Sequence, residues 1–214
     1  MSFFKHTAFK PLAILAGLAV ALNVGRVAMT GQIMDLYLTW NMILALLPLA
    51  VSSFMLWYLG RPRVFGFVLV FAGLVWLALF PNAPYLLTDF IHLRAGATLP
   101  IWYNILMFFS AATLGMFAMF YSLMEIEVLL LKRWSVTITR VIIAVLLLCT
   151  SFGIYIGRFL RWNSWDIFVN PRVLSNDIWQ IVAQTEQHKD VVPFTLIFFA
   201  FLLISYVAWR SSRA

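Results

Sequence analysis

Hydrophobic residues along the chain are grouped in long runs, and polar residues interrupt these runs at intervals. A helix needs about 20 apolar residues to cross the hydrocarbon core of a bilayer, with a range of ~17–25. Six runs approach or reach this length, so the pattern predicts six transmembrane helices. They are predicted over Leu12–Met29, Trp40–Leu59, Phe65–Phe80, Pro100–Leu123, Val136–Gly157 and Phe194–Trp209, and the fourth apolar run continues to Leu131.

The segment between the fifth and sixth runs predicts a shorter helix of a different kind. Four residues follow helical spacing there: Ile178, Ile181, Val182 and Thr185. They indicate an amphipathic helix at the outer membrane surface, with Ser175 or Asn176 as its N-cap. No linker or internal repeat divides the chain. The predicted fold is an all-α integral membrane protein, a single polytopic domain over residues 1–214 with about six transmembrane helices and a short outer interfacial helix.

Composition supports the membrane class. Hydrophobic residues make up 64% of the chain and charged residues only 11%, whereas a soluble domain carries roughly a quarter of its residues as charges. The net charge of +7 could suggest nucleic-acid binding. However, the basic residues lie at the ends of the apolar runs, as membrane topology requires, so the lipid bilayer is the expected partner. The single Cys149 excludes an internal disulfide.

The distribution of Lys and Arg predicts the orientation, because cytoplasmic loops carry the excess of these residues. With a cytoplasmic N-terminus, nine fall on the cytoplasmic side: Lys5, Lys10, Arg61, Arg63, Lys132, Arg133, Arg140, Arg210 and Arg213. Six fall outside: Arg26, Arg94, Arg158, Arg161, Arg172 and Lys189. Both termini are therefore expected in the cytoplasm. Residues 1–25 resemble a signal peptide but lack a convincing cleavage site, so we assign them to the first span.

The stretch "FPNAPYLLTDFIHLR", residues 80–94, is the first candidate for chemistry. Asn82 followed by Pro84 predicts a helix start, with Asn82 as the N-cap. In a helix, Tyr85, Asp89 and His92 fall on one stripe, so Asp89 and His92 are candidate catalytic residues for general acid–base work. The alternative is an interfacial helix with a hydrated polar face. A carboxylate near hydrocarbon is costly unless it is paired, which favours a role.

The second candidate is "SFGIYIGRFLRWNSWD", residues 151–166. If the helix continues, four of its residues form one stripe: Arg158, Arg161, Trp162 and Trp165. Two arginines on one face repel each other unless an anion lies between them, and Arg suits bidentate binding of such a group. The alternative is that Arg reaches toward water and Trp marks the interface, as both do at many span ends. We expect this motif to face the first one. The predicted substrate-binding residues are Asn82, Tyr85, Arg158, Arg161, Trp162, Asn163, Trp165 and Asp166.

Other polar positions indicate structure rather than chemistry. Asn23, Arg26 and Asn41 are interpreted as hydrogen bonding between helices. Glu125 and Glu127 are interpreted as a solvated helix end. Three histidines without metal-ligand spacing make a zinc site improbable, and nucleotide-binding and nucleophile-elbow motifs are missing. No metal or cofactor is therefore expected.

The two motifs resemble those of a family of bacterial multi-pass membrane proteins defined only as a domain of unknown function. "TWNMILALLPL", residues 39–49, extends the resemblance, which covers most of the chain from about residue 35. It implies a multi-pass fold in the bacterial cytoplasmic (inner) membrane, and it implies no activity or catalytic residue.

Three functional hypotheses follow from these residues, and whether the protein is an enzyme stays open. The first is a site at the extracytoplasmic mouth that binds or processes an anionic lipid or lipid-linked substrate. The second is a small transporter or channel, against which the spans show no paired broken helices. The third is a non-catalytic subunit of a membrane complex, in which the Asp and Arg side chains form a structural ion-pair network. Protein partners are not identified by the sequence.

Overall fold

Six of the helices are long and apolar enough to cross a membrane. They belong to a computed structural model that describes residues 3–61, 66–93, 99–183 and 189–212, and these ranges contain helices and turns but no strand. The predicted all-α integral membrane fold is therefore confirmed.

The elements follow one another along the chain in a simple order. They are α1 (Phe3–Thr30), the 3₁₀ turn η1 (Ile33–Leu36), α2 (Tyr37–Leu59), α3 (Gly66–Leu79), α4 (Asn82–Tyr85), the 3₁₀ helix η2 (Leu86–His92), α5 (Ile101–Leu131), α6 (Val136–Phe159), α7 (Asp166–Val169), α8 (Pro171–Ala183) and α9 (Val191–Ser211).

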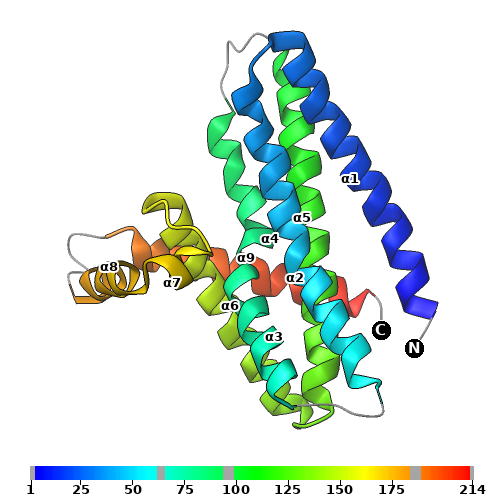
Figure 1. Cartoon of the computed structure of the whole chain (residues 1–214), viewed down its shortest axis with the longest axis vertical. Helices are drawn as coiled ribbons and strands as arrows, with labels where there is room; N and C mark the ends of the chain where they lie inside the picture. The colour runs from blue at the N-terminus through cyan, green and yellow to red at the C-terminus, as the bar shows by residue number, and fades with distance from the viewer. Residues whose placement is uncertain (1–2, 62–65, 94–98, 184–188, 213–214) are drawn as a thin grey trace.

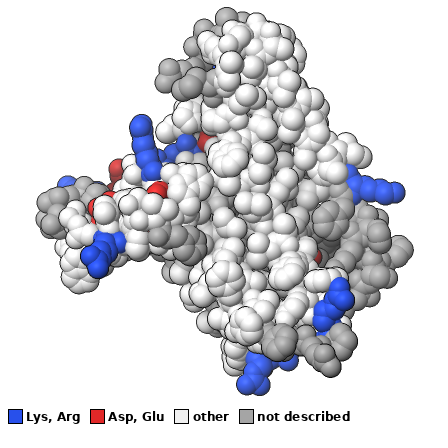
Figure 2. Space-filling model, viewed as in Figure 1, with Lys and Arg blue, Asp and Glu red and all other residues white. Residues whose placement is uncertain are grey.

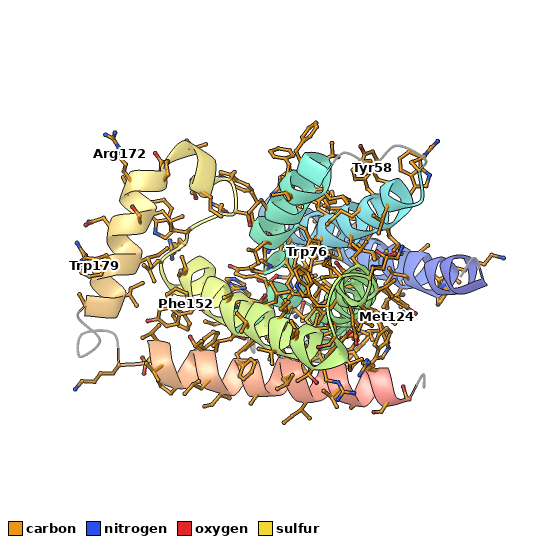
Figure 3. The ribbon with its side chains drawn as sticks, turned by 90° about the horizontal axis from the view of Figure 1, so that it is seen from below. Tyr58, Trp76, Met124, Phe152, Arg172 and Trp179 are labelled. Atoms are coloured by element: carbon orange, nitrogen blue, oxygen red, sulfur yellow. The ribbon has the colours of Figure 1, made fainter. Side chains whose placement is uncertain are left out.

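Helix α5 runs through the middle of the bundle and packs against α1, α2 and η2, whereas α6 packs chiefly against α9 (Figure 1). The face that α5 buries combines small residues, such as Ala111 and Ala118, with Leu114, Met119 and Leu123. Small residues let neighbouring backbones approach closely, which is how helices associate where no hydrophobic effect drives them together. In Figure 3, Trp76 of α3 lies inside the bundle.

The third span is broken. Its apolar helical stretch extends over Gly66–His92, but α3 ends at Leu79, and α4 and η2 follow after Pro81. Asn82 was predicted as the N-cap, and this is wrong: Pro81 holds that position with helical φ and ψ of −57° and −26°, and no side chain caps α4. The backbone is already helical at Pro81. The side-chain amide of Asn82 donates back to the carbonyl of Leu79 at 2.9 Å.

Several predicted boundaries shift. Helix α5 continues to Leu131, as its apolar run predicted, while α9 begins at Val191 instead of Phe194. Helix α1 begins before Leu12, and its membrane-crossing stretch is Lys10–Thr30.

The interfacial helix was predicted to begin at Ser175 or Asn176, but α8 begins at Pro171. Proline fits the first helical turn because the amide that it lacks would have no partner there. The amphipathic pattern is confirmed where side chains are described, since Ile181 is 2% exposed and Trp179 is 68% exposed. Arg172 and Trp179 lie on the outer side of α8 in Figure 3. The side chain of Val182 and all of Thr185 fall outside the described part.

Charge is distributed unevenly over the surface. Figure 2 shows Lys and Arg along the lower and right-hand edges, where the α2–α3 and α5–α6 connections, the start of α1 and the end of α9 lie in Figure 1. Acidic and basic residues mix on the left, around α7 and α8. Between these zones the surface in this view is mostly uncharged, as a lipid-facing belt must be.

Candidate functional site

The two sequence motifs meet at an ion pair. The Arg158 guanidinium at the end of α6 lies 2.5 Å from the Asp89 carboxylate on η2, measured between Nη2 and Oδ1. The two side chains are 10% and 1% exposed. The structure thus brings the two segments into contact, in agreement with the expectation that they face each other.

Arg158 contacts residues of both α4 and η2. Its Nε donates to the Thr88 hydroxyl at 2.8 Å, and its Nη1 lies 3.3 Å from Nε2 of His92. The guanidinium carbon lies 4.2 Å from the centre of the Tyr85 ring. Because Arg can only donate, Nε2 of His92 must accept in this contact, which places the proton of a neutral ring on Nδ1.

Asp89 is bound through both of its oxygens. Arg158 holds Oδ1, and the Asn41 amide of α2 donates to Oδ2 at 3.2 Å. Asp89 therefore joins three elements: α2, η2 and α6. Asp89 and His92 each contact a different nitrogen of Arg158, so the guanidinium is shared by the carboxylate and the imidazole. The geometry is that of a closed network.

Glycines allow the close approaches that build this network. A Cβ at Gly115 of α5 would stand 2.2 Å from the Ala83 carbonyl oxygen, so α4 can rest on α5 only where no side chain intervenes. A Cβ at Gly153 of α6 would stand 3.1 Å from the Pro81 ring, which is tighter than an ordinary contact. These contacts bring the break in the third span up against α6.

The predicted arginine–tryptophan stripe does not form. Helix α6 ends at Phe159, and Arg161 has a φ of 63°, so the chain turns away before Trp162. Arg158 points to η2, while Arg161 is exposed and has no hydrogen-bond or ion-pair partner among the described residues. The prediction assumed that the helix continued, and the left-handed turn at Arg161 separates the two arginines.

The segment after Arg161 is held by side-chain bonds. The indole of Trp162 donates to Asp177 of α8 at 3.0 Å, and the Asp166 carboxylate accepts from the Asn163 backbone amide at 2.7 Å. The Ser164 hydroxyl accepts from the Asn82 amide at 3.0 Å. Residues 162–183, the connection together with α7 and α8, are called the arm below.

A cavity of about 660 Å³ lies between the arm and the bundle. Its walls come from α2, α3, α4 and α6 on one side and from the arm on the other. Four of the predicted binding residues line it: Asn82, Tyr85, Trp162 and Asn163. Six predicted site residues do not: Asp89, His92, Arg158, Arg161, Trp165 and Asp166.

Most of the cavity wall is apolar, and sequence reasoning missed much of it. The missed residues include Leu44, Leu74, Leu77, Ile156, Ile167, Leu174 and Ile178, together with Cys149 and Thr150. The amphipathic spacing of α8 could have indicated Ile178, because the apolar face of an amphipathic helix packs against another apolar surface. Gly153 and Gly157, one turn apart on α6, could have indicated a hollow on that face.

The polar side chains of the cavity wall are uncharged. The Tyr85 hydroxyl and the Asn163 side-chain amide have no hydrogen-bond partner among the described residues. The side-chain nitrogen of Asn82 donates hydrogen bonds to Leu79 and Ser164, and its side-chain carbonyl oxygen can accept a hydrogen bond from a ligand. Such groups suit hydroxyls, esters or amides. Within the described ranges, His, Cys, Asp and Glu do not gather in groups of three as metal ligands do.

A second polar region lies toward the other end of α5. Glu125 accepts hydrogen bonds from Ser52 at 2.7 Å and from Ser53 at 2.8 and 2.9 Å. Glu127 accepts from the Tyr206 hydroxyl at 2.7 Å and pairs with Arg210 at 2.8 Å. The interpretation of Glu125 and Glu127 as a solvated helix end is wrong, because both carboxylates join helices.

A third group of polar side chains ties α1 to its neighbours, as predicted. Thr39 donates to Asn23 at 2.5 Å, and Arg26 donates to Asn104 of α5 at 2.5 Å. These bonds, with that of Asn41 to Asp89, are the helix–helix contacts that the sequence indicated.

Comparison with known families covers most of these regions. The model of the family described as "Protein of unknown function (DUF1361)" matches residues 40–205. The chain belongs to the DUF1361 family. The matched range contains both motifs, the broken third span and every residue that lines the cavity. Neither the curated proteins nor the solved structures that were compared gave a match.

Proposed function

We propose that this DUF1361 protein binds an amphipathic, lipid-like ligand in the cavity between the arm and the bundle. The observation that carries the proposal is the cavity itself. Its volume of about 660 Å³ lies within the ~300–1,000 Å³ typical of small-molecule sites. Mostly apolar walls with a few uncharged polar groups match a molecule that has a hydrocarbon chain beside hydroxyl or carbonyl groups.

Binding is better supported than catalysis. None of the described side chains that line the cavity is a carboxylate, a histidine or a cation. Asp89 and His92, the candidate catalytic pair, are both bonded to Arg158 outside the cavity. The ion pair helps to position the cavity wall. Arg158 lies against one face of the Tyr85 ring, and Tyr85 is part of that wall.

The proposed setting is the bacterial cytoplasmic membrane, with both ends of the chain in the cytoplasm and the arm on the opposite side. Six crossings return the chain to the side on which it starts. The basic residues at the lower and right-hand edges in Figure 2 support this orientation through the positive-inside rule. The bilayer would then supply the ligand. Fusing a reporter enzyme that is active only outside the cytoplasm to the C-terminus tests the orientation, and an active fusion would reject it.

A pair of neighbouring substitutions tests the binding site. Leu174 lines the cavity, whereas the preceding Val173 is 54% exposed and does not line it. Leu174→Trp should narrow the cavity under α8, and Val173→Trp should leave it unchanged. We expect native mass spectrometry to find tightly held lipid on the wild type and on Val173→Trp, and to find little on Leu174→Trp. Equal retention by the two variants would reject the cavity as the site.

A second candidate function is movement of the same ligand across the bilayer. The break in the third span favours it, because interrupted helices form the sites of many transporters, and Pro81 and Asn82 at the break line the cavity. Proteoliposomes with a fluorescent-headgroup lipid, quenched from outside, would measure this movement. A rate equal to that of protein-free vesicles would reject transport and leave the binding proposal intact.

A further inference from the structure

We propose that Arg161 is the anion-recognition residue at the mouth of the cavity, so that the ligand is an anionic amphiphile whose charged group remains outside the cavity. This inference rests on the proposed function, because it specifies the chemical class of the bound molecule. The apolar chain lies in the cavity, the neutral polar groups meet Asn82, Tyr85 and Asn163, and the anion contacts the guanidinium of Arg161.

The first support is position. Arg161 directly precedes Trp162, Asn163 and Ser164, which all line the cavity. Each of these three residues is also held by a hydrogen bond to α8, α7 or α4. The backbone that carries Arg161 is therefore fixed next to the lining segment, and its own side chain is exposed.

The second support is backbone conformation. Arg161 follows Leu160, the C-cap of α6, and its φ of 63° is the only positive φ of a non-glycine residue in the described chain. Glycine is the usual residue at this position, because a Cβ is disfavoured in the left-handed region. A residue kept in such a conformation is a reason to seek a function for its side chain.

The third support is charge. The cavity lining is uncharged, and Arg158, the nearest cation in sequence, is already neutralised by Asp89. The two carboxylates of the arm each accept a hydrogen bond from an uncharged donor, Asp166 from the Asn163 amide and Asp177 from the Trp162 indole. Arg161 has no such partner among the described residues. Arg is the side chain best suited to hold a phosphate or carboxylate through two parallel bonds.

The conformation of Arg161 makes a clean test possible. Arg161→Gly removes the charge and also relieves the left-handed backbone, so the variant should melt at or above the wild-type temperature. Arg161→Lys keeps the charge at the same place. Arg172→Gln removes another exposed charge from the arm and serves as the matched control.

Cys149, the only cysteine of the chain, lines the cavity and reports on its occupancy. The rate at which a water-soluble maleimide labels Cys149 would be measured in phosphatidylcholine nanodiscs. The discs would be doped with phosphatidic acid, with diacylglycerol as its neutral counterpart, or supplied with inorganic phosphate alone. We expect phosphatidic acid to protect Cys149 about tenfold better than diacylglycerol in the wild type and in Arg172→Gln, as a charge-assisted bond implies.

The outcomes separate the two proposals. Arg161→Gly should lose the preference for phosphatidic acid, and Arg161→Lys should keep most of it. Protection that persists unchanged in Arg161→Gly, yet is lost in Leu174→Trp, overturns the role of Arg161 and leaves the binding site standing. If no lipid protects Cys149, both proposals fail. Protection by inorganic phosphate alone would reject the proposal that the ligand is an amphiphile, and it would identify the ligand as the free anion.

Discussion

The carboxylate of Asp89 and the guanidinium of Arg158 lie 69 residues apart in the sequence and 2.5 Å apart in space. Their bond connects the broken third span to the end of α6, and Asn41 extends it to α2. Both side chains are almost fully buried, so each charge loses most of its hydration. The attraction between the two charges offsets this cost. The pair therefore fixes one wall of the cavity without facing into it.

Removing one partner should cost far more stability than removing both. Asp89→Asn leaves the buried Arg158 without its counter-charge, and we expect it to lower the free energy of unfolding by about 3–5 kcal/mol. The double variant Asp89→Leu, Arg158→Met removes both charges and should recover most of that loss. Thermal melts in detergent would compare the variants, with Asp166→Asn as a control. A double variant no more stable than Asp89→Asn would contradict this account.

Gly115 should not tolerate even a methyl group. A Cβ there would stand 2.2 Å from the Ala83 carbonyl oxygen, so Gly115→Ala must push α4 away from α5. We expect a loss of about 1–3 kcal/mol, the usual cost of overpacking. Gly17→Ala in α1 is the matched control because nothing lies within 4 Å of its added Cβ. That control should be neutral or slightly stabilising, since Ala favours helix more than Gly does. Equal melting temperatures for the two variants would show that α4 and α5 are not in contact.

The hydroxyl of Tyr206 should contribute measurably to stability. It donates to the buried Glu127 carboxylate at 2.7 Å, and hydrogen bonds to charged groups contribute roughly 1.5–3 kcal/mol. Tyr206→Phe should therefore lower the melting temperature clearly. The comparison is Tyr155→Phe, because Tyr155 is also buried but its hydroxyl has no hydrogen-bond partner among the described residues. Similar effects of the two substitutions would mean that the bond to Glu127 contributes nothing.

How much the sequence could predict depended on the range of each interaction. Apolar run length predicts the six spans, because the thickness of the bilayer sets the length of a helix whatever its neighbours are. The contact between the Asp89 and Arg158 segments was also predictable, because charges beside hydrocarbon need partners.

The failed predictions depended on tertiary contacts. Glu127 looks solvated in the sequence because its partner Tyr206 lies 79 residues away, and Glu125 likewise bonds Ser53 at a distance of 72 residues. The pattern of neighbouring residues in the sequence does not indicate pairings over such distances. The turn at Arg161 was unpredictable for the same reason, since the bonds that hold the following residues reach α4 and α8.

Helix α8 should move away from the cavity when its bond to the segment after α6 is lost. Helix α8 covers the cavity with Leu174 and Ile178, and the Trp162–Asp177 hydrogen bond, 3.0 Å long, joins it to the turn after α6. Asp177→Ala and Trp162→Phe should each speed maleimide labelling of Cys149, by up to about fivefold for a bond of ~1 kcal/mol. The double variant should be no faster than either single one, because both remove the same interaction. Ser175→Ala is the control, because the Ser175 hydroxyl bonds only within α8. Additive effects, or a Ser175→Ala variant that labels as fast as Asp177→Ala, would mean that this bond does not hold α8 over the cavity.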